Sequence, residues 1–308
     1  MSFLKTIGLL LIGLVFSANV DARLLLIVSQ ESGLYQEFIA GFNGYYKGES
    51  VDVEHSDFLS RQPGDLGKYS TIVVAGVSAA EKLAGVDVDG AQVIYTMMPL
   101  SSYRWLRDNT LLSGTGRHKV LYIDQPVHRF VSLAKEAFPH IKSLGFLHGD
   151  VSAVYVDELK NELAAEQIEL VDGRLIPRKK GSGDLKSIFA KSDALLLLPD
   201  PHLYNRRSVQ KVLLASFRYK RPLISYSESF VKAGALLGLF STPRDIGMDT
   251  ADLAMCRDEK CRNVASTGFY PKHFSVLVNS AVARQLGIKI KSSEELQGYL
   301  EAVDNAAK

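Results

Sequence analysis

The sequence has only two cysteines, a net charge of only +2, and none of the short motifs that mark the common catalytic sites. It contains no Gly-x-Ser-x-Gly elbow, no His-Glu-x-x-His helix and no Gly-Lys-Ser/Thr phosphate loop. Gly114-Thr115-Gly116 lacks the third glycine and the preceding strand of a dinucleotide loop, so we interpret it as a turn. Nucleic-acid-binding domains usually carry a concentrated basic face, and a net charge of only +2 does not indicate one. We therefore expect no catalytic residue, cofactor, metal or nucleic-acid partner.

The two cysteines, Cys256 and Cys261, are separated by only four residues. In an oxidising compartment such a close pair typically forms a local disulfide, and we expect one here. Two cysteines without a nearby histidine make a poor zinc site, and a reactive dithiol is more often Cys-x-x-Cys. The short loop makes the entropic contribution of the disulfide small, so its expected role is structural.

The N-terminal 22 residues predict export. One positive charge at Lys5 precedes an apolar run from Ile7 to Phe16, which is followed by Val20-Asp21-Ala22. This order is typical of a secretory signal peptide cleaved before Arg23. The run is about half as long as the roughly 20 residues of a membrane-spanning helix, although an uncleaved anchor is the alternative. We expect a periplasmic mature chain of about 286 residues, long enough for two lobes.

The mature sequence alternates short apolar runs with amphipathic stretches, which is typical of a parallel α/β architecture. Leu24 to Ser29, for example, is a continuous apolar run, as expected of a strand buried on both faces. The further expected strands are 51–55, 71–75, 92–96, 119–124, 143–148, 169–171, 194–198, 222–225, 235–240 and 274–278. Helices are expected within 35–46, 79–84, 126–138, 155–163, 185–190 and 209–217.

The β/α pattern restarts near residue 143, and two late strands follow it without close helical partners. This arrangement predicts two Rossmann-like lobes with parallel sheets that the chain crosses more than once. We expect lobe 1 at 23–122 plus about 240–270, and lobe 2 at 123–239 plus about 271–308. Ligands bind at the carboxyl ends of strands in such sheets, so two facing lobes predict one shared cleft and hinge closure.

Five expected strand ends carry short polar segments with small residues, namely 29–32, 76–78, 148–152, 199–201 and 226–228. Serine, glutamine and backbone N–H groups at helix starts suit an anionic group such as a carboxylate. Asp200 or Glu228 could receive an amine, and Tyr35, Tyr122 or Tyr226 could offer a ring face. Helix capping explains each residue equally well, so it is the convergence of five segments that favours a binding site.

Several segments resemble one exported family in their order and spacing. They are 143–148 (SLGFLH), 193–200 (DALLLLPD), 221–225 (RPLIS), 233–236 (AGAL), 245–247 (DIG) and 278–288 (VNSAVARQLGI). The chain resembles ABC-transporter substrate-binding proteins of the aromatic amino-acid-binding type, which have the type I periplasmic binding protein fold. The resemblance spans most of the mature chain and is strongest from 143 to 288.

This resemblance implies two lobes joined by a multi-stranded hinge of three strands, a monomer, and a small-molecule ligand passed to a membrane ABC permease. The residues at the family's ligand-facing loops are Ser29, Gln30, Ser78, Asp150, Asp200 and Tyr226. Two segments depart from the family. Met98-Pro99-Leu100 replaces a common Asp-Pro, which bears on the ligand class, and the stretch from Cys256 to Cys261 replaces a Gly-Lys turn.

The sequence therefore predicts a solute-binding protein for an ABC importer, whose ligand is amino-acid-like or aromatic. The alternative from another class is a periplasmic sensing subunit that reports ligand occupancy to a membrane signalling protein. A two-lobed, glycosyltransferase-like enzyme also fits the architecture. It finds less support because exported proteins rarely meet nucleotide sugars and the sequence has no phosphate loop.

Overall fold

The computed structural model describes residues 23–48, 50–60, 66–88, 90–114, 118–174, 182–200, 203, 206–256 and 268–306. The predicted signal peptide, residues 1–22, lies outside the described residues, and so does Cys261. The predicted disulfide and cleavage site therefore stay predictions. Within the described ranges, no helix is both long and apolar enough to cross a membrane.

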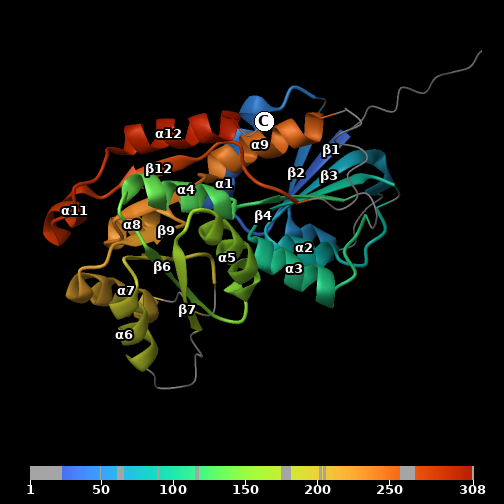
Figure 1. Ribbon diagram of the computed structural model, residues 1–308. Helices are drawn as coiled ribbons and strands as arrows, with labels where there is room; N and C mark the ends of the chain where they lie inside the picture. Colours follow the sequence, from blue (N-terminus) through green and yellow to red (C-terminus); the bar gives the residue numbers. More distant parts are fainter. Residues whose placement is uncertain are drawn as a thin grey trace, which may run out of the picture.

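The described strands form two six-stranded sheets (Figure 1). The first sheet has the order β11-β5-β4-β3-β1-β2, and all of its strand pairs are parallel. Its strands are β1 (Arg23–Val28), β2 (Val51–His55), β3 (Tyr69–Ala75), β4 (Gln92–Met98), β5 (Lys119–Tyr122) and β11 (Gly268–Phe269). Leu24 to Val28 are all buried, because helices cover both faces of this sheet.

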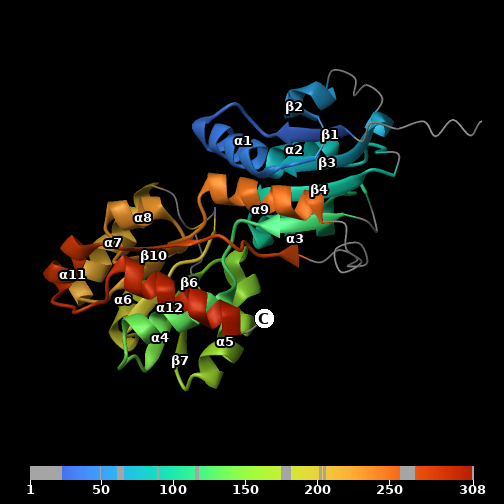
Figure 2. The same cartoon turned by 90° about the horizontal axis from the view of Figure 1, so that it is seen from above.

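Alternate residues of these strands face two apolar layers. Leu24 and Leu26 pack with α1 (Gly33–Tyr45) and α9 (Pro243–Met255), whereas Leu25 and Ile27 belong to the layer that holds α2 (Val77–Leu83) and α3 (Leu100–Asn109). Figure 2 shows α1 beside α9. The short 3-10 helices η1 (Ser56–Ser60) and η2 (Leu66–Lys68) complete this first lobe, which we define as the first sheet and the helices on it.

Helices α1 and α9 pack closely because glycine occupies the contact on each helix. A Cβ atom at Gly41 would lie 2.2 Å from the Arg244 carbonyl oxygen, and one at Gly247 would lie 2.2 Å from the Phe38 carbonyl oxygen. The start of α9 is fixed by a capping box, in which the Thr242 hydroxyl and the Asp245 side chain each accept a backbone N–H.

The second sheet has the order β12-β10-β9-β8-β6-β7, in which β12 alone runs antiparallel to its neighbour among the described pairs. Its strands are β6 (Ser143–His148), β7 (Glu169–Arg174), β8 (Ala194–Leu196), β9 (Leu223–Ser225), β10 (Leu237–Phe240) and β12 (Ser275–Val278). The helices of this second lobe are α4 (Val127–Ala137), η3 (Ser152–Tyr155), α5 (Val156–Ala165), α6 (Ser182–Lys191), α7 (Arg206–Tyr219), α8 (Glu228–Ala233), α11 (Ser280–Leu286) and α12 (Ser293–Ala306).

The two faces of the second sheet are also covered. Buried side chains of α4, α5 and α12 pack on one face, and those of α6, α7 and α8 pack on the other. Ile188 and Val212 belong to the second of these layers, and Phe130 and Leu300 to the first. The predicted fold class, two Rossmann-like lobes with parallel sheets, is confirmed, and β12 is the antiparallel exception among the described pairs.

Three segments of the chain join the two sheets: 123–126 between β5 and α4, 241–242 between β10 and α9, and 270–274 between β11 and β12. The sequence reasoning placed most strands within a few residues, but it did not predict strand β11 or the helices α3, α8, α9, α11 and α12. The joining segments follow the carboxyl ends of β5, β10 and β11. Figures 1 and 2 show the two lobes side by side, with segments of the chain running between them.

Candidate functional site

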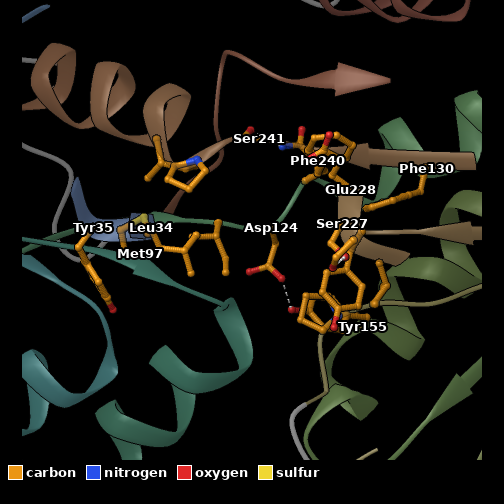
Figure 3. A pocket seen from close by; sticks show the side chains of 18 of the residues that line it. Leu34, Tyr35, Met97, Asp124, Phe130, Tyr155, Ser227, Glu228, Phe240 and Ser241 are labelled. Atoms are coloured by element: carbon orange, nitrogen blue, oxygen red, sulfur yellow. Dashed lines mark hydrogen bonds between the residues drawn. The ribbon is translucent and has the colours of Figure 1, made fainter. Parts of the chain in front are cut away.

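A cavity of about 430 Å³ lies between the lobes, where strands of both sheets end (Figure 3). From the first lobe it is lined by the β1–α1 loop, the end of β4 and the start of α9, and from the second by the ends of β8 and β9. The apolar and aromatic lining residues are Leu34, Tyr35, Met97, Ile123, Phe130, Tyr155, Leu198, Pro199, Tyr226, Phe240, Pro243 and Ile246. The polar ones are Gln30, Asp124, Gln125, Ser227, Glu228, Ser229 and Ser241.

Asp124 lies in the first joining segment and connects both lobes. One of its carboxylate oxygens accepts the Leu100 N–H at 2.6 Å, at the start of α3 in the first lobe. The other accepts the Tyr155 hydroxyl at 2.8 Å, in the second lobe, as the dashed line in Figure 3 marks. The carboxylate thereby supplies an acceptor to a helix N-terminus, which favours its negative charge.

Burial disfavours the ionised form of the Asp124 carboxyl. Asp124 is only 4% exposed, and desolvation raises its pKa from 3.8 to about 6, although the bonds from Leu100 and Tyr155 lower it. Burial, and then the nearby Asp124 charge, raises the pKa of the Tyr155 hydroxyl, which therefore stays protonated and donates. Burial, followed by the charges of Asp124 and Asp200, raises the pKa of Tyr226 to about 12.

Gln125 lines the cavity and forms hydrogen bonds that connect the joining segments. Its side-chain amide donates to the Ser241 hydroxyl at 2.7 Å, and its carbonyl oxygen accepts from Arg129 at 2.6 Å. The Ser241 hydroxyl donates in turn to the His273 carbonyl oxygen. One chain of bonds thus crosses all three joining segments, and two of its members line the cavity.

Arg129 is the buried end of this chain. Besides Gln125, it donates to the Pro271 carbonyl oxygen at 2.8 Å and pairs with both carboxylate oxygens of Asp304 on α12. Its guanidinium also lies over the ring of Phe274, 4.4 Å from the centroid. Four of its five N–H donors bond to protein acceptors, so Arg129 orients Gln125 and fixes the joining segments.

Met97 lines the cavity in a rare backbone conformation. Its φ is +54°, in the left-handed region that non-glycine residues seldom adopt. The β4–β5 register is irregular between Tyr95 and Met98, so the end of β4 departs from the ladder at this point. Strain of this kind, typically about 1–3 kcal/mol, concentrates where a backbone shapes a site.

Two of the six site residues predicted from the sequence, Gln30 and Tyr226, line the cavity. Ser29 does not line it. Its hydroxyl donates to the Ala75 carbonyl oxygen at 3.1 Å and accepts the Ala79 N–H at 2.9 Å, so it joins β1 to the β3–α2 turn. Ser78 is exposed on α2 and is also outside the lining.

The two predicted aspartates are also outside the lining, for opposite reasons. Asp200 is 1% exposed and accepts bonds from the Gly149 N–H, the Ser152 N–H and hydroxyl, and the Leu203 N–H. It organises the loops after β6 and β8. Asp150 is highly exposed and forms a surface ion pair with Arg174 at 2.6 Å.

Of the further candidates, Tyr35 and Glu228 line the cavity, whereas Tyr122 is 6% exposed and packs with the rings of Tyr103 and Tyr270. The sequence reasoning missed Asp124, the last residue of the expected fifth strand, and Gln125, which follows it. The signal was present, because a polar pair stands there between a strand and the proline that precedes a helix. The same strand-end rule would have selected them.

The site can bind a small molecule through apolar walls and a few fixed polar groups, which is the usual composition of a ligand pocket. Within the described ranges, no group of three or more His, Cys, Asp or Glu side chains is arranged to hold a metal ion.

Comparison with solved structures finds chains of the same fold that match nearly the whole length of this one. A conserved domain protein from Vibrio cholerae is 21% identical with a TM-score of 0.55, covering 91% of this chain and 98% of that one. An ABC domain in complex with L-Trp from Streptococcus pneumoniae is 15% identical, with a TM-score of 0.55 and coverage of 90% and 98%. A ligand-free, open substrate-binding protein with adhesive properties from Clostridium difficile is 18% identical, with a TM-score of 0.63 and coverage of 89% and 97%.

These identities show the fold alone. A search of curated protein sequences finds no match. The model of the family described as ABC transporter substrate binding protein, however, matches residues 121–299, which is more than half of the chain and includes much of the cavity lining. The chain belongs to the ABC transporter substrate binding protein family.

Proposed function

We propose that the protein is an exported solute-binding protein, which captures an amino-acid-like or aromatic molecule between its lobes and delivers it to a membrane ABC permease. The observation that carries this proposal is the cavity between the lobes, lined by the ends of strands from both sheets. A ligand there touches both lobes at once, so its binding favours their closure.

The composition of the cavity supports the ligand class. Tyr35, Phe240 and Tyr226 provide ring surfaces on different elements, while Gln125 and Ser241 provide polar groups at the joining segments. Planar, apolar bodies with a few polar atoms suit such a lining. The L-Trp complex of the Streptococcus pneumoniae domain agrees with this choice of ligand class.

The proposed organisation keeps the boundaries expected from the sequence: a signal peptide at 1–22, lobe 1 at 23–122 plus about 240–270, and lobe 2 at 123–239 plus about 271–308. Export would place Cys256 and Cys261 in an oxidising compartment, where we propose that they pair. Mass spectrometry of the mature chain, alkylated with and without prior reduction, tests both proposals. An N-terminus other than Arg23, or alkylation of both cysteines without reduction, contradicts them.

The function is tested on the chain from Arg23, unfolded and refolded to remove carried ligand. A ligand that binds only the folded state raises its stability, so a thermal-shift panel should show a concentration-dependent rise for some amino-acid-like or aromatic compound. Calorimetry would then give the stoichiometry, which we expect to be one per chain. A flat panel, across amino acids and other metabolites alike, would count against solute binding.

A further inference from the structure

The charged side chains that line the cavity are both acidic. Asp124 and Glu228 are carboxylates, and none of the described lining residues is a lysine, arginine or histidine. Glu228 forms an ion pair with Lys232 at 2.7 Å, and both side chains are at least half exposed. The charge of Glu228 is therefore screened by solvent at the rim of the cavity, whereas the charge of Asp124 is buried inside it.

Asp124 is held by neutral donors alone. Its partners are the Leu100 N–H and the Tyr155 hydroxyl, and it takes part in no ion pair among the described residues. A carboxylate that is 4% exposed loses most of its hydration, and two neutral hydrogen bonds do not replace a counter-ion. The raised pKa of about 6 reflects this desolvation.

The negative charge of Asp124 also affects Tyr226, on the second-lobe side of the cavity. After burial, the charges of Asp124 and Asp200 are the causes that raise the pKa of Tyr226, whose ring lines the second-lobe side of the cavity. Tyr226 and Phe240 present aromatic rings, whose faces attract cations. Figure 3 shows Asp124 between the Leu34 and Met97 side of the cavity and the Ser227 and Tyr155 side.

We propose that the cavity selects a ligand with a net positive charge: an amine or other organic cation on an apolar or aromatic body, with no carboxylate. The cation would face Asp124 and supply the counter-ion that none of the described residues provides. A ligand carboxylate would instead meet two acidic side chains and no described cationic one. This inference rests on the proposed function and narrows its ligand class from amino-acid-like compounds to amines.

Matched ligands test the inference on the refolded mature chain by calorimetry. Each set shares one aromatic body and differs in charge, for example tryptamine, tryptophan and indole-3-propionate, or phenethylamine, phenylalanine and 3-phenylpropionate. We expect the amine of at least one set to bind at least roughly tenfold more tightly than the amino acid, and the acid to bind weakest. Aliphatic diamines and choline are tested as further cationic ligands.

Asp124→Asn keeps the size and hydrogen-bonding capacity of the side chain and removes its charge. We expect it to weaken binding of the best amine roughly 10- to 100-fold, the range of a charge-assisted hydrogen bond. Asp150→Asn, at a highly exposed carboxylate outside the cavity lining, is the matched control and should change affinity less than roughly threefold. Circular dichroism and thermal melts confirm that both variants fold.

The outcomes separate the inference from the function. If the amino acid or the acid binds more tightly than the matched amine, the cation inference is overturned and solute binding stands. The same holds if a neutral sugar or nucleoside binds and no amine does. Equal affinity of wild type and Asp124→Asn for an amine also overturns it. If no compound of either panel binds, the proposed function fails, and the inference fails with it.

Discussion

Asp124→Asn should stabilise the ligand-free protein at neutral pH, by an amount that depends on pH. The folded protein raises the pKa of this carboxyl from 3.8 to about 6 through burial. Between these values the folded state binds more protons than the unfolded state, so the free energy of unfolding falls as pH rises. The ionised carboxylate thus destabilises the fold above about pH 6, and an uncharged side chain removes that cost.

The magnitude follows from the same two pKa values. At about 1.36 kcal/mol per pKa unit, a rise from 3.8 to about 6 costs at most about 3 kcal/mol, and roughly 2 kcal/mol of this develops between about pH 4.5 and pH 7.5. Asparagine preserves the local bonds, because its oxygen can accept the Leu100 N–H while its amide donates to the Tyr155 hydroxyl oxygen. The expected difference therefore comes from charge.

Urea unfolding at several pH values measures the difference in unfolding free energy between Asp124→Asn and wild type. The difference should grow in favour of the variant by roughly 2 kcal/mol from about pH 4.5 to pH 7.5. Asp150→Asn is the control, since its highly exposed carboxylate forms only a surface ion pair and should give a nearly flat profile. A flat profile for Asp124→Asn would refute the interpretation of Asp124 as a desolvated charge.

Three further substitutions test the hinge and the first lobe. Arg129→Met should destabilise the protein by about 3–5 kcal/mol, because the Asp304 carboxylate, only 14% exposed, loses the guanidinium and keeps only His128 at 3.7 Å; an unfolding free energy unchanged within about 1 kcal/mol would contradict this role of Arg129. Thr242→Ala should cost about 1 kcal/mol in urea unfolding through loss of the α9 cap, and a neutral result would show that Asp245 suffices. Gly247→Ala should cost about 1–3 kcal/mol, since its Cβ would meet the Phe38 carbonyl oxygen; a wild-type melting temperature would mean that α1 and α9 separate freely.

The apolar runs of the sequence determined the fold class. A strand such as β1, buried on both faces, must be apolar throughout, so its position can be read from residues 24–28 alone. Helices with weaker amphipathic patterns were harder to predict. Helix α9 was missed because its buried surface includes Gly247, Asp249 and Thr250, which are not recognisable as a core-facing stripe in the sequence.

The polar residues were predicted less well, because a strand-end position does not determine a role. Ser29 and Asp200 stand at strand ends as expected, yet their bonds to neighbouring loops leave them outside the cavity lining. Gln30, which follows Ser29 in the same segment, lines the cavity, and so does Tyr226 in the segment 226–228. One residue along the chain changes which partners a side chain can reach, and only the packed loops decide that.

The sequence by itself thus determined two parallel α/β lobes and a binding region at their strand ends, because hydrophobic periodicity and strand-end placement are local properties of the chain. Only the tertiary structure decided which polar groups meet in that region. Asp124, Leu100 and Tyr155 come together from a joining segment and from both lobes, and Arg129 meets Asp304 across 175 positions of sequence. Such contacts depend on how the lobes are joined and packed, which no local pattern records.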